Sequence, residues 1–117
     1  MIDVTATARE TGFEMSVAVT VEAWQDAVAW DDDNGTGRQR EADRLWQVLV
    51  MARRCYSPSR TRSAFPVVRV PHTQGDRLAR LPRVITLHLV TGRSQTGRLV
   101  ATITRPGQEP GRNPTPN

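Results

Sequence analysis

The chain has 117 residues, of which 38% are apolar and 24% are charged, and this balance is typical of one globular domain rather than a disordered segment. The formal net charge is +4, and the single cysteine, Cys55, excludes an internal disulfide and a metal site made of several cysteines. No apolar run approaches the roughly 20 residues that cross a bilayer, and the N-terminus lacks the basic and apolar regions of a signal peptide. We therefore predict a small, soluble, cytoplasmic protein that does not contact a membrane.

The N-terminal region is predicted to form a short helix followed by a connector. The helix extends from Asp3, a suitable N-cap, to Gly12, a suitable left-handed stop. Residues 13 to 20 show a mixed pattern in which Val17 and Val19 alternate with smaller residues. This pattern indicates either a short extended piece or a connector.

Two further helices are predicted before residue 55. Residues 21 to 30 follow Thr20, a favourable N-cap, and Val21 and Trp24 share a face that we expect to lie against the core. Residues 39 to 54 are apolar on most of the helix surface, which predicts a central helix packed on both sides. We expect all three tryptophans in the core, because tryptophan at helical spacing is more often packed than exposed.

Beyond residue 64 the hydrophobic period changes from that of a helix to that of strands. Three segments show this pattern: 65 to 70, 83 to 91 and 99 to 105. The loop at 92 to 97 has a glycine at both ends and predicts a hairpin. We therefore predict an α+β fold in which two or three N-terminal helices pack on one face of a three-stranded antiparallel meander. Residues 1 to 105 are predicted to form this single domain, and residues 106 to 117 a flexible tail rich in proline and glycine.

The net charge conceals an uneven distribution along the chain. Residues 1 to 43 hold ten acidic residues against three arginines, a net charge of −7. Residues 44 to 117 hold thirteen arginines against two acidic residues, a net charge of +11, and the chain has no lysine. This asymmetry indicates either a charged partner or two faces that hold each other together within the molecule.

Two charged faces are candidates for binding a partner. An acidic face would imitate nucleic-acid phosphates, and its candidate residues are Asp31, Asp32, Asp33, Glu41 and Asp43. A basic face would bind phosphate, because the guanidinium group forms two parallel charge-assisted hydrogen bonds. Its candidate residues are Arg60, Arg62, Arg77, Arg80, Arg83, Arg93 and Arg98. Aromatic residues are scarce in this half, so the pattern predicts phosphate contact without base readout.

No motif in the sequence dictates a reaction. Cys55, His72 and His88 belong to three distant segments, so we expect neither a metal site nor a Cys–His nucleophile. The acidic run at residues 31 to 35 departs from the spacing of a calcium-binding loop. We therefore predict a protein without catalytic residues, metal or cofactor, and a small enzyme that uses Cys55 or a histidine is the least favoured alternative.

Four segments of the chain, residues 17 to 30, 41 to 52, 69 to 71 and 81 to 87, share a pattern that consists mostly of tryptophan and apolar positions. This pattern resembles a family of short uncharacterised proteins carried on bacterial plasmids and other mobile elements. The resemblance covers about residues 2 to 106 and concerns the fold, and it implies no catalytic residue.

The resemblance implies a mobile-element context, in which small proteins without catalytic motifs often block host defence complexes. We therefore predict a non-enzymatic inhibitor of host defence, of anti-CRISPR type, that binds and occludes a host protein or nucleoprotein complex. The alternative is an arginine-rich nucleic-acid-binding accessory protein for plasmid maintenance or transfer. That alternative predicts an affinity that falls steeply as the salt concentration rises.

Overall fold

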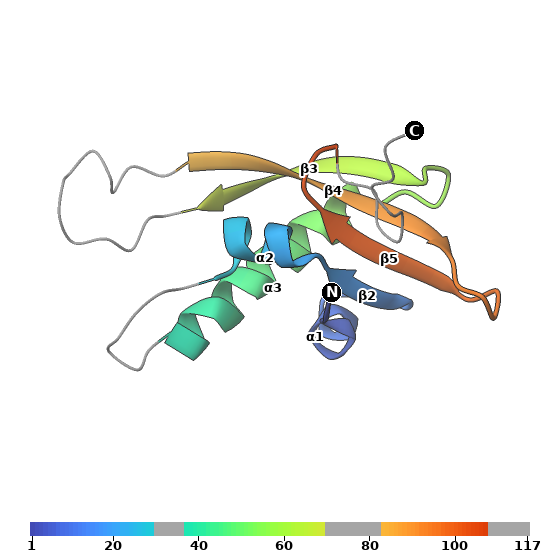
Figure 1. Cartoon of the computed structure of the whole chain (residues 1–117), viewed down its shortest axis with the longest axis horizontal. Helices are drawn as coiled ribbons and strands as arrows, with labels where there is room; N and C mark the ends of the chain where they lie inside the picture. Colours follow the sequence, from blue (N-terminus) through green and yellow to red (C-terminus); the bar gives the residue numbers. More distant parts are fainter. Residues whose placement is uncertain (30–36, 70–82, 108–117) are drawn as a thin grey trace, which may run out of the picture.

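A computed structural model of the chain describes residues 1–29, 37–69 and 83–107 (Figure 1). The described residues form one mixed sheet with the strand order β1-β2-β5-β4-β3. Its strands are β1 Ile2–Asp3, β2 Ser16–Val19, β3 Arg62–Arg69, β4 Arg83–Arg93 and β5 Leu99–Thr104. The helices are α1 Thr5–Glu10, α2 Val21–Ala27 and α3 Gly37–Cys55. Strand β2 is parallel to β5, and all other neighbouring strands are antiparallel.

The predicted three-stranded antiparallel meander with N-terminal helices is wrong. Strands β3, β4 and β5 do pair antiparallel, but β2 extends the sheet in parallel with β5, and β1 adds a fifth strand. Val17 and Val19 are each 1% exposed and lie opposite Ala101 and Ile103 of β5. A four-residue strand has a weak local signal, and its partner is the last strand of the chain, so only tertiary packing decides this pairing.

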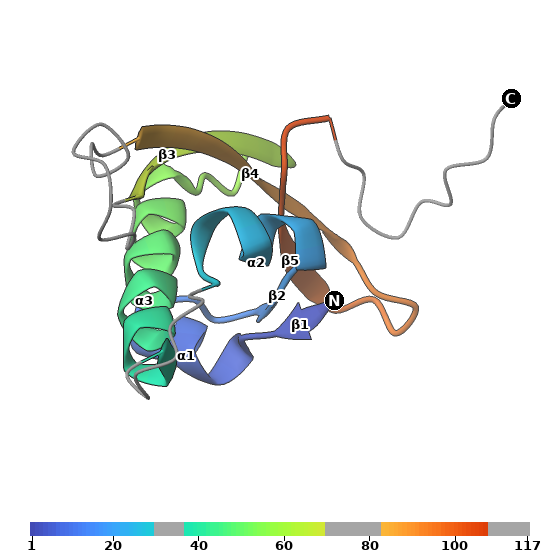
Figure 2. The ribbon, with the colours of Figure 1, turned by 60° about the vertical axis from the view of Figure 1, so that its left-hand side comes forward.

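The three helices gather on one side of the curved sheet (Figures 1 and 2). Helix α3 packs along β3, α1 packs against β2, and α2 packs against β5. The core lies between these layers because alternate strand residues face the helices. Its largest fully buried side chains include Phe65 of β3, Leu87 and Leu89 of β4, and Leu49 of α3.

Local signals fix the ends of the two short helices. The Thr20 hydroxyl accepts a hydrogen bond of 3.2 Å from a backbone N–H in the first turn of α2, which confirms the predicted N-cap. Gly12 has a φ of 109°, which confirms the predicted left-handed stop after α1. The N-cap of α1 is Val4 rather than Asp3. The Asp3 carboxylate instead accepts hydrogen bonds from the hydroxyl (2.6 Å) and backbone N–H (3.0 Å) of Thr5, and these bonds lower the pKa of Asp3.

Two side chains that we expected in the core lie at the surface. Val21 is 46% exposed at the start of α2, and Trp46 is 42% exposed on the flank of α3. The face of α3 toward the sheet is already filled by Leu45, Val48, Leu49 and Ala52. Trp24 is partly buried against the core, as predicted, whereas Trp30 lies outside the described residues.

The predicted boundary between domain and tail stays a prediction. Strand β5 ends at Thr104, and the described chain continues only to Gly107. Residues 108–117, which make up most of the predicted tail, lie outside the described residues.

Candidate functional site

The structure places two of the five residues of the predicted acidic face. Glu41 is half-buried and Asp43 is exposed, and both belong to the N-terminal half of α3. The other three residues, Asp31, Asp32 and Asp33, lie outside the described residues. An acidic surface formed by all five therefore stays a prediction.

The start of β3 holds two residues of the predicted basic face. Arg60 is exposed in the turn before the strand. Arg62 is half-buried, and its Nη1 lies 3.0 Å from Nδ1 of His88 on the neighbouring strand β4. Three further predicted residues are not placed: Arg77 and Arg80 lie outside the described residues, as does the side chain of Arg83.

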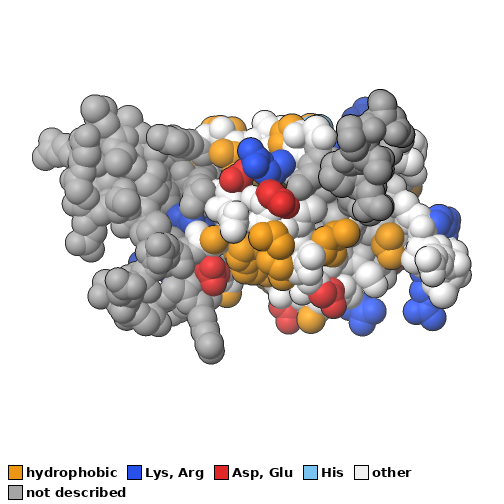
Figure 3. All heavy atoms as spheres, in the orientation of Figure 1, with side chains coloured by type: hydrophobic (Ala, Val, Ile, Leu, Met, Phe, Trp, Pro, Cys, Tyr) orange, Lys and Arg blue, Asp and Glu red, His pale blue; other side chains and the backbone are white. Residues whose placement is uncertain are grey.

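The hairpin between β4 and β5 holds the remaining two residues, Arg93 and Arg98, and both are exposed. Arg93 donates a hydrogen bond of 3.0 Å from Nη1 to the backbone oxygen of Gly97. The register of β3 against β4 brings the turn with Arg60 to the same end of the sheet as this hairpin. Arginine side chains, in blue, are visible at this right-hand end of the molecule in Figure 3.

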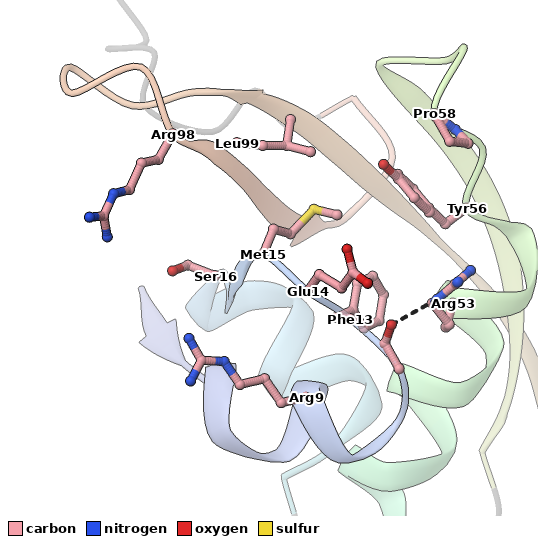
Figure 4. A pocket seen from close by; sticks show the side chains of 11 residues that line it. Arg9, Phe13, Glu14, Met15, Ser16, Arg53, Tyr56, Pro58, Arg98 and Leu99 are labelled. Carbon is pink, nitrogen blue, oxygen red and sulfur yellow. Dashed lines mark hydrogen bonds between the residues drawn. The ribbon is translucent and has the colours of Figure 1, made fainter.

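At this end of the sheet, a hollow of about 590 Å³ opens between α1, the C-terminal end of α3, β2 and β5 (Figure 4). Three arginines line it, each from a different segment: Arg9 from α1, Arg53 from α3, and Arg98 from the turn before β5. We call this cavity the arginine hollow. Its lining also includes the aromatic rings of Phe13 and Tyr56 and one carboxylate, Glu14.

Contacts on both sides of Arg53 fix its position. Its Nε donates a hydrogen bond of 3.2 Å to the backbone oxygen of Gly12, and its Cζ lies 5.7 Å from the centroid of the Tyr56 ring. The centroids of the Tyr56 and Phe13 rings are 6.4 Å apart. A Cβ on Gly12 would lie 3.5 Å from Nε of Arg53, an ordinary van der Waals distance, so the left-handed φ of 109° and not the approach of Arg53 requires glycine here.

The other charged side chains of the hollow have no partner among the described residues. Arg9, Arg98 and Glu14 are exposed, and their side chains make no hydrogen bond or ion pair with any part of the chain that the structure describes. Three arginines and one glutamate thus line a single cavity. An excess of one charge in a concave site raises the local concentration of counter-ions, so the hollow favours anions.

Local sequence patterns did not reveal this site. Arg9 stands in the acidic half of the chain, and Arg53 is not among the predicted residues of the basic face. The bond that joins Arg53 to Gly12 spans 41 residues, and the ring contact of Tyr56 is with Phe13, from the other half of the chain. Only Arg98 was among the predicted basic residues.

The two oppositely charged halves of the chain also contact each other directly. Nε of Arg105, just after β5, lies 2.9 Å from Oδ2 of Asp26 on α2. These side chains are 53% and 44% exposed, so the ion pair contributes little to stability. Part of the charge asymmetry is therefore used in an ion pair within the molecule. Neither residue of this pair lines the arginine hollow.

A second cavity of about 350 Å³ lies between α3 and β3. Its lining residues are Trp46, Gln47, Val50, Met51, Pro66, Val67 and Val68, none of which is charged. We call this cavity the apolar groove. Strand β3 forms one edge of the sheet, so the groove follows an edge of the fold.

Neither a metal centre nor a Cys–His pair is found in the described part of the chain. No three His, Cys, Asp or Glu side chains come together there as metal ligands would. Cys55 packs against the core, whereas His88 alternates with the buried Leu87 and Leu89 and so belongs to the other face of β4. Within residues 1–29, 37–69 and 83–107, no helix has the length and apolar content needed to cross a membrane.

No family model, curated protein or solved structure matches this chain. The resemblance to a family carried on mobile elements therefore stays a prediction.

Proposed function

We propose that the protein is a non-enzymatic nucleic-acid-binding accessory protein, the alternative of the two sequence-based hypotheses. The observation that supports this function is the convergence of Arg9, Arg53 and Arg98 on one cavity. The guanidinium group suits phosphate because its planar fork forms two parallel charge-assisted hydrogen bonds. Two of these groups have no protein partner among the described residues, so their hydrogen-bonding capacity is available for a ligand.

A polymer of phosphates fits this surface better than one isolated anion. Arg60 and Arg93 are exposed at the same end of the sheet as the hollow, and they extend the positive charge beyond it. Successive phosphates of one strand would contact successive arginines, and each contact would release counter-ions. Occlusion of a host complex by the acidic face has less support, because its two described carboxylates, Glu41 and Asp43, line neither the arginine hollow nor the apolar groove.

The first test is the salt dependence of binding to a fluorescently labelled oligonucleotide, measured by anisotropy. Three phosphate contacts on a single strand predict that the affinity falls about 20-fold between about 50 and about 200 mM salt. Absence of binding at the lower salt concentration would refute the proposed function.

The second test assigns the binding to the hollow by charge reversal. Arg98→Glu is expected to weaken binding about tenfold or more, because it removes one phosphate contact and adds a repulsive charge. Arg54→Glu is the matched control, since Arg54 is exposed on α3, outside the hollow, and the change in net charge is the same. Equal losses in the two variants would mean that net charge alone, and not the hollow, binds the nucleic acid.

A further inference from the structure

We infer that the arginine hollow binds one nucleotide unit of a single-stranded nucleic acid, with the phosphate at Arg9 and Arg98 and the base against Tyr56. This inference rests on the proposed function and adds the strand state and the orientation of the ligand. It departs from the expectation from sequence that the arginines contact phosphate without an aromatic platform, because Tyr56 lines the same cavity.

The hollow has a cationic end and an aromatic end (Figure 4). Arg9, Arg98 and the exposed Ser16 lie at one end, whereas Tyr56 and Arg53 lie at the other. Ser16 begins β2 and pairs with Val100 of β5, two residues after Arg98, so its hydroxyl belongs to the same end as that arginine. Two guanidinium groups and a hydroxyl are donors that a phosphate group accepts from.

The aromatic end has one ring that a ligand can reach. Phe13 is only 3% exposed and belongs to the core, whereas Tyr56 is half-buried and lines the cavity. The Phe13 ring, tilted by 50°, and the Arg53 guanidinium fix the position of Tyr56. The Tyr56 hydroxyl makes no hydrogen bond within the described chain. A ring that is already fixed loses little conformational entropy when a base stacks on it.

A base stacked on Tyr56 must be unpaired. A duplex presents only base edges in its grooves, whereas a single strand offers the faces of its bases to aromatic side chains. The volume of about 590 Å³ lies within the range of small-ligand sites and suits one nucleotide unit rather than a double helix.

Glu14 favours one orientation of the bound nucleotide unit in the hollow. Its carboxylate lines the hollow together with the arginines and has no partner among the described residues. In Figure 4 it lies on the Phe13 and Arg53 side of the cavity, away from Arg9 and Arg98. Repulsion between this carboxylate and a phosphate favours the phosphate at the opposite end. Glu14→Gln is therefore expected to increase the affinity for a single strand about threefold.

The decisive experiment compares three ligands on the same protein: a single-stranded 12-mer, the duplex of the same sequence, and AMP. At low salt we expect the single strand to bind at least about tenfold tighter than the duplex or AMP, because only it offers both an unpaired base and several phosphates. Tyr56→Leu should reduce the affinity for the single strand about tenfold, while Tyr56→Phe, which keeps the ring, should bind as the wild type does. Trp46→Leu is the control, because it removes an exposed ring outside the hollow.

A spectroscopic readout does not depend on whether the variants fold. The chain has one tyrosine, so selective labelling gives a single set of ring resonances. Stacking of a base is expected to shift these resonances when the single strand is titrated, and the duplex is expected to leave them in place.

The outcomes separate this inference from the proposed function. Equal, salt-dependent binding of both strand forms, with no effect of Tyr56→Leu, would overturn the inference and leave the proposed function intact. Tighter binding of AMP than of the single strand would assign the hollow to a free nucleotide and overturn the inference. Absence of binding to either strand form at low salt would overturn both.

Discussion

The arginine hollow and the apolar groove both use α3, but they are lined by different kinds of residues. The groove is lined by the flank of α3 and by β3, two elements that follow each other in the chain. The hollow brings together α1, the segment before β2, the end of α3 and the turn before β5. Side chains from distant segments therefore meet in the hollow, whereas the groove is a consequence of packing a helix beside an edge strand.

The backbone of β3 also disfavours the pairing of a further strand at this edge of the sheet. The backbone N–H of Thr91 donates to the backbone oxygen of Thr61. The backbone N–H and C=O groups of odd-numbered β3 residues therefore point toward β4, and those of even-numbered residues point to the open edge of the sheet. Pro66 is one of these even-numbered residues, and proline has no backbone N–H to donate at the open edge. The open edge thus lacks one donor, which is a common protection against edge-to-edge pairing.

The hollow has no comparable structural explanation for its charges. Arg53 is fixed by the Gly12 oxygen and the Tyr56 ring, but Arg9 and Arg98 stabilise no described contact through their side chains. Like charges near one cavity disfavour the folded state unless a ligand of opposite charge is bound. We therefore propose the hollow, rather than the groove, as the binding site, and the following variants test this proposal.

The largest expected effect is that of Phe13→Ala, because the aromatic end of the hollow is part of the core. Phe13 is 3% exposed, and its removal is expected to lower the free energy of unfolding by about 3–5 kcal/mol. Urea denaturation measures this loss, with Phe13→Leu as the smaller change. A loss below about 1 kcal/mol would mean that the hollow is not anchored on the core.

Gly12→Ala should cost less stability but should also disturb the hollow. The positive φ of 109° strains any residue with a Cβ, and we expect a loss of about 1–3 kcal/mol. Relief of this strain would shift the backbone oxygen of Gly12 that accepts from Nε of Arg53, so oligonucleotide affinity should fall as well. The added methyl group itself, 3.5 Å from this Nε, would make only an ordinary van der Waals contact. Gly92→Ala is the control, because nothing lies within 4 Å of its Cβ position and its φ is not positive. Identical effects of the two changes would contradict the role of Gly12.

The variant Trp46→Ala distinguishes most clearly which of the two cavities binds the oligonucleotide. Trp46 is 42% exposed, so its removal should cost about 1–2 kcal/mol, well below the cost of a buried aromatic residue. Oligonucleotide affinity should stay at the wild-type value, because Trp46 lines the apolar groove and not the arginine hollow. A drop in oligonucleotide affinity with unchanged stability would indicate that the binding site is the apolar groove and not the hollow.

The sequence predicted the long elements and missed the way they assemble. The 19-residue α3 and the strands β4 and β5 have enough residues for their periodicity to be unambiguous. The pairing of β2 with β5 depends on residues more than eighty positions apart, as in Val17 opposite Ala101. Trp46 was misplaced for a similar reason, since a helix that is apolar on most sides does not reveal which flank the sheet leaves uncovered.

The candidate site was predictable only in part. Clustered arginines in the second half indicated a basic surface, and Arg93 and Arg98 do lie together at the hairpin. Arg9 and Arg53 were not among the candidates, because only the fold brings them to the same cavity as Arg98. No local pattern relates the Gly12 oxygen to a guanidinium group 41 residues later.

The smallest expected effect concerns the start of α1, the helix that positions Arg9 at the hollow. Hydrogen bonds from Thr5 lower the pKa of Asp3 in the folded protein, so the carboxylate contributes stability above its unfolded pKa of about 3.9. This contribution is lost as the pH falls through the lower folded pKa. Asp3→Asn should therefore show a shallower decline of the thermal midpoint below about pH 4 than the wild type. No such change is expected for Glu10→Gln at the exposed end of the same helix, and identical profiles for all three proteins would show that Asp3 does not hold the start of α1.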